Sequence, residues 1–271
     1  MKQLRAIRIL FAALFFAACT ACLVIGPHVH PMAKAAQALQ ISLAASSTAL
    51  GVTALWLLVT FLFGRIYCAS VCPVGVLSDL FLGIRRAVPR LNLPFRFRHR
   101  SRIGRNLLWI YVLSVIFGIS IIVFVIEPYN IARNIAAAAN PQAIGSTWGA
   151  FGRGAVTGIA IGILSLLFIA LSSIRHGREF CAEICPLGTA LGFVQAHARM
   201  HIEFDPDKCD SCGICEDRCR TQSIKVVSRY VDQQRCVRCF DCVADCPRGA
   251  IRYQINRNRP ASPLLRKVGS K

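Results

Sequence analysis

Acidic residues are scarce in this sequence: 13 Asp and Glu residues stand against 32 Lys and Arg residues, which gives a formal net charge of +19. A basic surplus of this size can indicate nucleic-acid binding. No recognised nucleic-acid-binding motif accompanies the charge, so we exclude that class of partner. The haem-attachment pattern C-x-x-C-H is absent as well, which excludes covalently attached haem.

Charged residues are missing altogether from four long apolar stretches, at residues 9–26, 41–63, 106–126 and 155–174. With 55% hydrophobic residues and a mean hydropathy of +0.50, the chain is too apolar for an ordinary soluble domain. Each stretch can cross a hydrocarbon core of about 30 Å as a helix of about 20 residues. The sequence therefore predicts a helical membrane domain with four spans over residues 1–198.

Basic residues are distributed unevenly around these spans. They precede the first span and fill the connection at 65–105, whereas the two other connections hold only Lys34, Arg133 and Arg153. The positive-inside rule predicts that both termini and residues 65–105 lie on the cytoplasmic side of a bacterial inner membrane. The first stretch also resembles a lipoprotein signal ending at Cys19, an alternative that leaves the rest of this topology unchanged.

A short motif occurs twice, as GRIYCASVCPVG at 64–75 and as GREFCAEICPLG at 177–188. One copy follows the second span and the other follows the fourth. The chain therefore reads as a duplicated two-helix unit with a pseudo-two-fold axis along the membrane normal. Pro73 and Pro186 suit the first turn of a helix after each motif.

Each motif carries two cysteines spaced C-x-x-x-C-P. The duplication predicts that Cys68, Cys72, Cys181 and Cys185 lie at one depth and meet face to face, provided that the second and fourth spans are central neighbours. Four thiolates suit one metal cluster. Two dithiols that cycle through disulfides, or plain anchoring of helix ends by small residues, remain alternatives.

The strongest signal lies near the C-terminus, where CDSCGICEDRC and CVRCFDCVADC both have the spacing C-x2-C-x2-C-x3-C. Disulfides are disfavoured in a reducing cytoplasm, and zinc sites do not explain two such sets. The spacing is that of two [4Fe–4S] clusters that exchange their fourth ligands. Cluster A then uses Cys209, Cys212, Cys215 and Cys246, and cluster B uses Cys219, Cys236, Cys239 and Cys242.

These cysteines lie in a region that fits a bacterial-type α+β ferredoxin domain over residues 199–254. HIEFD and AIRYQ read as strands, and IKVVSRYV reads as a hairpin or turn. One irregularity is Arg220, which follows Cys219 where such motifs often have proline. Residues 255–271 form a basic tail without periodicity.

The combination of four spans, CASVCPVGVLSDL, HGREFCAEICPLGTALG and the two cluster motifs resembles the NapH type of ferredoxin-like quinol dehydrogenase, a membrane component. Similar cores occur in a methylamine-utilisation protein, a nitrous-oxide-reductase regulator and a copper-reducing assembly protein. The resemblance implies an electron-transfer subunit with quinol as donor. It also implies an iron–sulfur or cytochrome partner and a periplasmic reductase such as nitrate reductase. Two alternative functions remain: an assembly or metal-reducing factor that uses the clusters to mature a redox enzyme, and a binding scaffold in which the clusters are structural.

A quinol site needs groups that bind the quinol oxygens and accept protons. The outer ends of the first and third spans offer His28, His30, Glu127 and Tyr129 as candidate catalytic residues. Such side chains also serve as interface anchors. On the cytoplasmic side, His176, His197 and Glu183 are weaker candidates. Cys19 and Cys22 fit a helix–helix contact better than a further cofactor.

Overall fold

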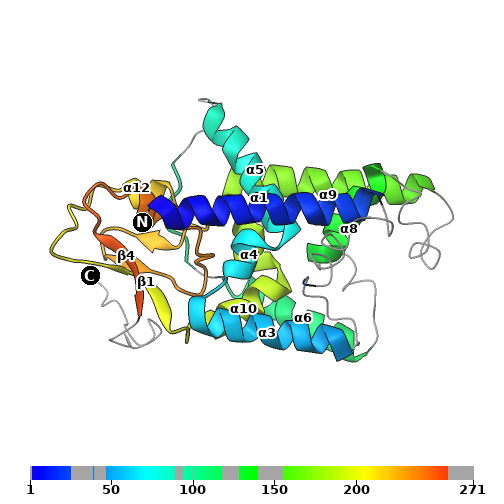
Figure 1. Cartoon of the computed structure of the whole chain (residues 1–271), viewed down its shortest axis with the longest axis horizontal. Coiled ribbons are helices and arrows are strands. Elements are labelled where there is room, and N and C mark those ends of the chain that lie inside the picture. Colours follow the sequence, from blue (N-terminus) through cyan, green and yellow to red (C-terminus); the bar gives the residue numbers. More distant parts are fainter. Residues whose placement is uncertain are drawn as a thin grey trace.

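A computed structural model of the chain describes residues 2–25, 39, 47–88, 94–99, 101–117, 128–139 and 155–255. Helices make up the first part of these residues, and a small α+β region follows (Figure 1). The helices are α1 (Lys2–Ile25), α3 (Ser47–Phe63), α4 (Ile66–Ser70), α5 (Pro73–Ala87), α6 (Ile103–Ile116), α8 (Pro128–Ala139), α9 (Ala155–His176), the π-helix η2 (Phe180–Ile184) and α10 (Pro186–Gln195). The α+β region contains β1 (Met200–Phe204), α11 (Ile214–Asp217), β2 (Ile224–Lys225), β3 (Tyr230–Val231), α12 (Asp241–Asp245) and β4 (Ile251–Ile255).

One of the described helices is long and apolar enough to cross a membrane, namely α1 over Gln3–Ala21. Three shorter apolar helices, Gly51–Phe63, Ile103–Ile116 and Ala160–His176, fall within the other three predicted spans or overlap them. Residues 41–46 and 118–126, which complete two of those predicted spans, lie outside the described residues.

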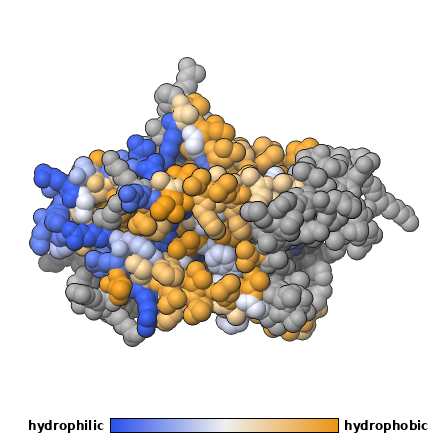
Figure 2. Space-filling model, in the orientation of Figure 1, coloured by the Kyte–Doolittle hydropathy of each residue, from blue (hydrophilic) through white to orange (hydrophobic). Residues whose placement is uncertain are grey.

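The surfaces of these helices are strongly apolar. Figure 2 shows hydrophobic side chains over the helices and hydrophilic residues at the end that carries the strands. Contiguous exposed apolar surface of this kind marks contact with a membrane or another protein. On the four apolar helices the exposed large side chains include Leu10, Phe11, Leu14, Leu55, Leu58, Phe61, Trp109, Ile110, Leu113, Ile116, Ile163, Leu164, Leu167 and Phe168.

The α+β region lies at one end of the helices, beside the N-terminus (Figure 1). Arg5 near the start of α1 donates a 2.6 Å hydrogen bond to Asp245 in α12. Tyr253 in β4 donates a 2.7 Å bond to the carbonyl oxygen of Phe63, the last residue of α3. The backbone at the end of α9 accepts a bond from Gln222. The start of α1 and the ends of α3 and α9 therefore share the same end of the molecule.

In each repeat, the helix that follows the motif packs on the long helix of the other repeat. Helix α5 of the first repeat packs on α9 of the second, and α10 of the second packs on α3 of the first. Figure 1 shows α3 and α9 along opposite edges of the bundle. The expectation that the second and fourth spans must be central neighbours is therefore wrong, because the helices that follow the motifs bring the two repeats together.

Helix α8 is a further difference from the sequence prediction, which had a short outer connection between the third and fourth spans. This helix packs on α9, α1 and α5. Ile131 is 4% exposed and lies in the same apolar core as the four motif cysteines. Part of the connection thus folds back into the bundle, because one face of PYNIARNIAAAA is apolar at helical spacing.

The α+β region contains the strands that the sequence predicted. β1 pairs antiparallel with β4, and β2 pairs antiparallel with β3 as a short hairpin. Burying each large aliphatic side chain of its core stabilises the fold by about 1.5–3 kcal/mol. The core side chains, apart from cysteines, are Ile202, Ile224, Val226, Val231, Phe240, Val243 and Ile251.

Candidate functional site

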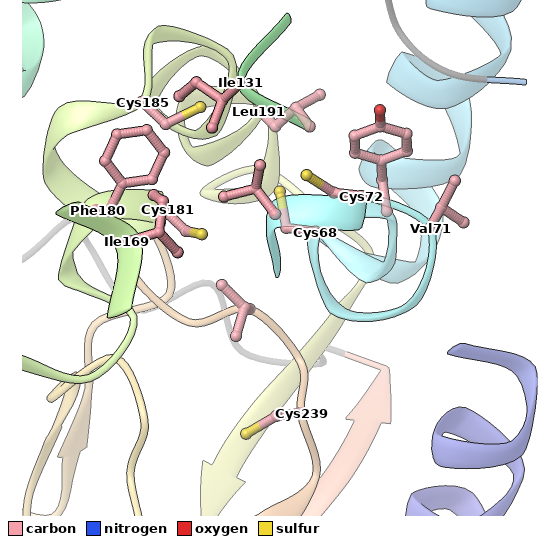
Figure 3. Close-up of a cluster of buried hydrophobic side chains, with 13 residues drawn as sticks. Cys68, Val71, Cys72, Ile131, Ile169, Phe180, Cys181, Cys185, Leu191 and Cys239 are labelled. Atoms are coloured by element: carbon pink, nitrogen blue, oxygen red, sulfur yellow. The ribbon is translucent and has the colours of Figure 1, made fainter. Parts of the chain in front are cut away.

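The four cysteines of the repeated motif lie in one apolar core (Figure 3). Cys68 and Cys72 come from α4 and the residue before α5, and Cys181 and Cys185 come from η2 and the residue before α10. Each is 5% exposed. The structure therefore brings both cysteine pairs into one buried place.

The same local geometry builds the motif in both repeats. Gly64 and Gly177 have φ angles of 85° and 68°, a left-handed conformation that glycine adopts without strain. Cys72 and Cys185 both have φ −65° and ψ 119°, and each is followed by proline at the first helical position. The sulfur of Cys185 accepts a 3.3 Å bond from the backbone N–H of Gly188. The second cysteine thus stands at the N-terminus of the following helix.

The last glycine of each motif allows a close backbone contact. A β-carbon at Gly75 would meet the carbonyl oxygen of Cys68, and one at Gly188 would meet that of Cys181, both far inside van der Waals distance. Only glycine fits at these positions while the backbone keeps its course. The glycines therefore hold each helix start against the first cysteine of its own motif.

Arginine side chains connect the two motifs. Arg178 of the second motif donates to the carbonyl oxygens of Cys68 at 2.9 Å and Gly75 at 2.7 Å, both in the first motif. Arg65 of the first motif donates in return to the carbonyl oxygens of Cys181, at 3.4 Å, and Gly188. Each repeat thus binds the equivalent backbone atoms of the other. The sequence signal for this role is the Gly-Arg pair, which recurs in both copies of the motif at 64–65 and 177–178.

Burial governs the acidity of the motif thiols. It raises the pKa of Cys181 to about 11, against the opposing effect of Arg178. Burial likewise raises the pKa of Cys68, Cys72 and Cys185, and neighbouring motif thiols add to the rise for Cys72 and Cys185. Free thiols here hold their protons at neutral pH, so a bound metal would displace them.

The predicted ligands of cluster A surround one cavity. Cys209, Cys212, Cys215 and Cys246 all line one pocket beside α11. Cys212 is exposed, and Cys209 and Cys246 are half-buried. This part of the molecule is open to a partner.

The predicted ligands of cluster B lie deeper. Cys219, Cys236, Cys239 and Cys242 are all buried. Burial raises the pKa of Cys242 well above its ordinary value, and the charges of Cys239, Cys236 and Cys219 add to this effect. Cys219, from the first cysteine motif, thus lies among cysteines of the second, as an exchange of fourth ligands requires. Cys239 also belongs to the apolar core that holds the four C-x-x-x-C-P cysteines (Figure 3).

These sets suit iron–sulfur clusters by their donor chemistry. All the donors are thiols, and the cysteines that the structure describes form no disulfide. Among the described residues, no three His, Cys, Asp or Glu side chains form a group that could hold a metal ion. The thiolates of a four-iron cluster each bind a different iron and so stand further apart than the ligands of a single ion.

A buried charge network joins the α+β region to the helices. Asp79 of α5 forms ion pairs with Arg178 and Arg220, each at 2.6 Å, and with Arg8 at 3.2 Å. Burial alone would raise the pKa of Asp79, but the three arginines outweigh it and hold this pKa at about 2. Arg220 also pairs with the buried Asp241 at 2.5 Å. Arg220, which stands where such cysteine motifs often have proline, therefore links the cluster region to the first repeat.

Glu183, inside the second motif, has a similar connecting role. Its carboxylate is buried and accepts hydrogen bonds from Arg235 and from the hydroxyl of Ser101, the latter at 2.6 Å. It therefore links η2 both to the cysteine motif at 236–246 and to the segment before α6. This pairing favours a structural role over the proton-relay role considered from the sequence.

Most of the quinol-site candidates fall outside the part of the chain that the structure describes. This applies to His28, His30 and Glu127. Tyr129 is half-buried in the first turn of α8. The cytoplasmic alternatives His176 and His197 are both exposed. The structure therefore does not test the predicted quinol site.

The two cysteines of the first apolar stretch differ in what the structure describes. Cys19 is fully buried within α1. The side chain of Cys22 lies outside the described residues. Burial of Cys19 agrees with the predicted helix–helix contact.

Family models match three segments of the chain. A model described as "4Fe-4S binding domain" matches residues 48–91 and 157–204, which are the two copies of the repeat. Another model with the same description matches residues 202–225. Segments in both parts of the molecule thus match models of [4Fe–4S] binding domains.

Several curated proteins are similar to the chain over much of its length. An uncharacterized protein of Methanocaldococcus jannaschii is 24% identical over 198 residues, which are 73% of this chain and 67% of that protein. Ferredoxin-type protein NapH of Haemophilus influenzae is 24% identical over 216 residues, or 76% of this chain and 68% of NapH. Methylamine utilization ferredoxin-type protein MauN of Paracoccus denitrificans is 26% identical over 158 residues, or 58% of this chain and 48% of MauN. No solved structure matches the chain.

Proposed function

Since the chain belongs to the NapH-type family of ferredoxin-like electron-transfer proteins, we propose that it is the quinol-oxidising relay subunit of a respiratory chain. In this role it takes electrons from membrane quinol and delivers them, through an iron–sulfur or cytochrome partner, to a periplasmic reductase such as nitrate reductase. The observation that carries the proposal is the shared core of Cys239 with Cys68, Cys72, Cys181 and Cys185.

That shared core supports a continuous path. The four motif cysteines lie at its inner end, and Cys239 joins them to the ligand set of cluster B. The ligands of cluster A, with Cys212 exposed, lie at the outer end. When bound, the clusters supply one-electron storage and transfer. The cysteines of the motif core and of cluster B are buried, whereas most of those of cluster A are not, as a relay between the helices and a docked partner requires.

The apolar helices support placement in a membrane with four spans. Their exposed faces are dominated by Leu, Ile, Phe and Trp side chains. The start of α1 and the ends of α3 and α9 share the end that carries the α+β region (Figure 1). We place this end, which is also rich in arginine, in the cytoplasm by the positive-inside rule.

Quinol oxidation releases protons as well as electrons, so the site needs proton acceptors. We assign this role to His28, His30, Glu127 and Tyr129 at the outer ends of the first and third spans, as the sequence suggests. Ionisable groups at a membrane edge are functional candidates by default. Protons released there leave on the outer side.

At the inner end of the path, we assign to Cys68, Cys72, Cys181 and Cys185 a single shared metal centre. The match of both repeats to a [4Fe–4S] binding family model supports metal over dithiol chemistry. The reciprocal binding of Arg65 and Arg178 holds the backbones of the two motifs together, as a shared centre requires.

Iron and sulfide analysis of the purified protein, handled without oxygen, tests this assignment. Two [4Fe–4S] clusters account for about eight irons per chain, so we expect a higher count that falls to about eight in Cys68→Ser. Electron transfer from a quinol analogue to cluster A should be lost in the same variant. A matched control is Cys19→Ser, which should keep the full iron count.

A count of about eight irons in both the unmodified protein and Cys68→Ser contradicts the third centre. Thiol labelling that changes on reduction would then establish the dithiol alternative. If quinol fails to reduce the clusters while dithionite succeeds, the maturation alternative replaces the quinol-oxidising role.

A further inference from the structure

The two arginines that connect the repeats differ in their charge partners. Both side chains are fully buried. Arg178 pairs with the carboxylate of Asp79 at 2.6 Å. Arg65 has no acidic partner among the described residues. It donates instead to the carbonyl oxygens of Gly188, Cys181 and Arg235, the last at 2.6 Å.

The sequence explains this difference between the repeats. Asp79 stands four residues after Gly75, and the equivalent position four residues after Gly188 is Gly192. A β-carbon at Gly192 would lie 3.7 Å from the guanidinium of Arg65 but only 2.7 Å from the carbonyl oxygen of Gln234. The position faces Arg65 and has no room for an acidic side chain. The second repeat therefore leaves the charge of Arg65 without a carboxylate.

A buried cation without a counter-ion is strongly destabilising. Arg65 donates to the carbonyl oxygens of Cys181 and Gly188, so its charge lies beside the four-cysteine site. We propose that Arg65 is the counter-cation of the four-cysteine centre and a positioning residue that favours its more negative state. This inference rests on the proposed function, because it requires a centre that contains thiolates.

The two chemistries proposed for the cysteines differ in charge. Two disulfides carry no charge and would leave Arg65 unbalanced in the core. Four thiolates around an iron–sulfur core leave a net negative charge, which Arg65 offsets. A fully buried arginine beside the cysteine site, with no carboxylate partner among the described residues, thus favours a metal–thiolate centre as the resting state of the site.

Substitution of Arg65 separates its charge from its hydrogen bonds. In Arg65→Gln the charge is lost, and we expect the midpoint potential of the centre to shift to more negative values. In Arg65→Lys the charge stays while the planar fork of donors is lost, so the potential should stay close to that of the unmodified protein. Redox titration of the purified full-length protein, followed by the spectrum of the third centre, measures both.

A second experiment covers the case in which Arg65→Gln fails to assemble the centre. The double variant Cys68→Ser/Cys181→Ser lacks the centre, so Arg65 becomes an unbalanced buried charge there. Adding Arg65→Gln to this background should raise the melting temperature, whereas the same change in the unmodified protein should lower it. Circular dichroism of the detergent-solubilised chain measures both effects.

Three results would overturn the inference. An unchanged potential in Arg65→Gln with full iron content would show that its charge does not act on the centre. A lower melting temperature in both backgrounds, or a shift in Arg65→Lys as large as in Arg65→Gln, would show that only its hydrogen bonds matter. All three results leave the proposed function intact. A count of about eight irons in the unmodified protein would instead refute the shared metal centre, and the inference with it.

Discussion

Arg220 stands directly after Cys219, where ferredoxin motifs often carry proline. In this molecule the position supplies a buried cation rather than a rigid turn. Arg220 pairs with Asp79 in α5 and with Asp241 in α12. It therefore joins the cluster region to the first repeat, and Asp79 is the point where Arg8, Arg178 and Arg220 meet.

Replacing Asp79 with Asn should lower the free energy of unfolding by about 3–5 kcal/mol, because three buried arginines would lose their common partner. Thermal unfolding and protease release of the α+β region measure this. The matched control is Asp210→Asn, which breaks an exposed pair with Arg248 and should change the free energy by no more than about 1 kcal/mol. Equal effects of the two substitutions would contradict the network.

The same carboxylate sets a pH dependence. The pKa of Asp79 falls from its ordinary 3.8 to about 2, since Arg178, Arg220 and Arg8 outweigh burial. A depressed carboxylate pKa stabilises the fold above the ordinary value and loses this contribution as pH falls through the folded value. The difference in melting temperature between the unmodified protein and Asp79→Asn should hold from about pH 8 to about pH 5 and shrink below about pH 4. A difference that shrinks already near neutral pH would show that another group titrates.

Cys219 tests the exchange of ligands between the two clusters. Cys219→Ser should damage the cluster bound by Cys236, Cys239 and Cys242, because its sulfur lies among those of the second motif. Cys246→Ser is the matched control and should damage the cluster in the cavity of Cys209, Cys212 and Cys215 instead. Electron paramagnetic resonance of the two reduced variants distinguishes these outcomes. The assignment fails if Cys219→Ser removes the signal that Cys212→Ser also removes.

At the scale of elements, the repeated unit consists of an apolar helix, a left-handed glycine turn, a short helical turn with the first cysteine, and a helix that starts at proline. Each part occurs in both repeats, and the second cysteines have the same backbone angles, although the short helical turn is α-helical in the first repeat and a π-helix in the second. The helix after each motif packs on the long helix of the other repeat. This exchange, with the exchanged arginines, is what places the two cysteine pairs in one core.

Gly75→Ala tests the close contact at the start of α5. Its β-carbon would meet the carbonyl oxygen of Cys68, so we expect loss of the four-cysteine centre. Gly83→Ala in the same helix has nothing within 4 Å of the added carbon and should stabilise the helix by about 0.5–1 kcal/mol. Iron analysis and thermal unfolding of both variants measure the contrast. Retention of the full iron count in Gly75→Ala would show that the start of α5 can move.

At the scale of the whole molecule, apolar helices and a charged cluster region occupy different ends (Figures 1 and 2). The N-terminus and the α+β region lie together at one end (Figure 1), and Arg86 and Arg98 of the connection at 65–105 donate hydrogen bonds to that region. The cysteines of the motif core and of cluster B are buried, and those of cluster A are on the whole more exposed. In the proposed role, electrons that enter between the helices reach a docked partner at the charged end, and that partner delivers them to the periplasmic reductase.

The predicted topology follows from this separation. Reporter fusions after Lys34 and within residues 141–153 should read as external, and one after Arg100 should read as internal. The segment 141–153 is a better position than Arg133, because α8 packs within the bundle. An internal signal at Lys34 would rule out the four-span arrangement.

Local spacing in the sequence determined the duplicated motif, the two cysteine sets and the strands of the α+β region. Each of these depends on residues close together in the chain, where spacing and periodicity act directly. The tertiary structure alone decided that Arg65 and Arg178 bind the opposite motif, that Arg220 reaches Asp79, and that Ile131 returns to the cysteine core. These contacts join residues far apart in the sequence. Which buried arginine meets a carboxylate and which meets a carbonyl depends on the packing of helices from different repeats, which no local pattern encodes.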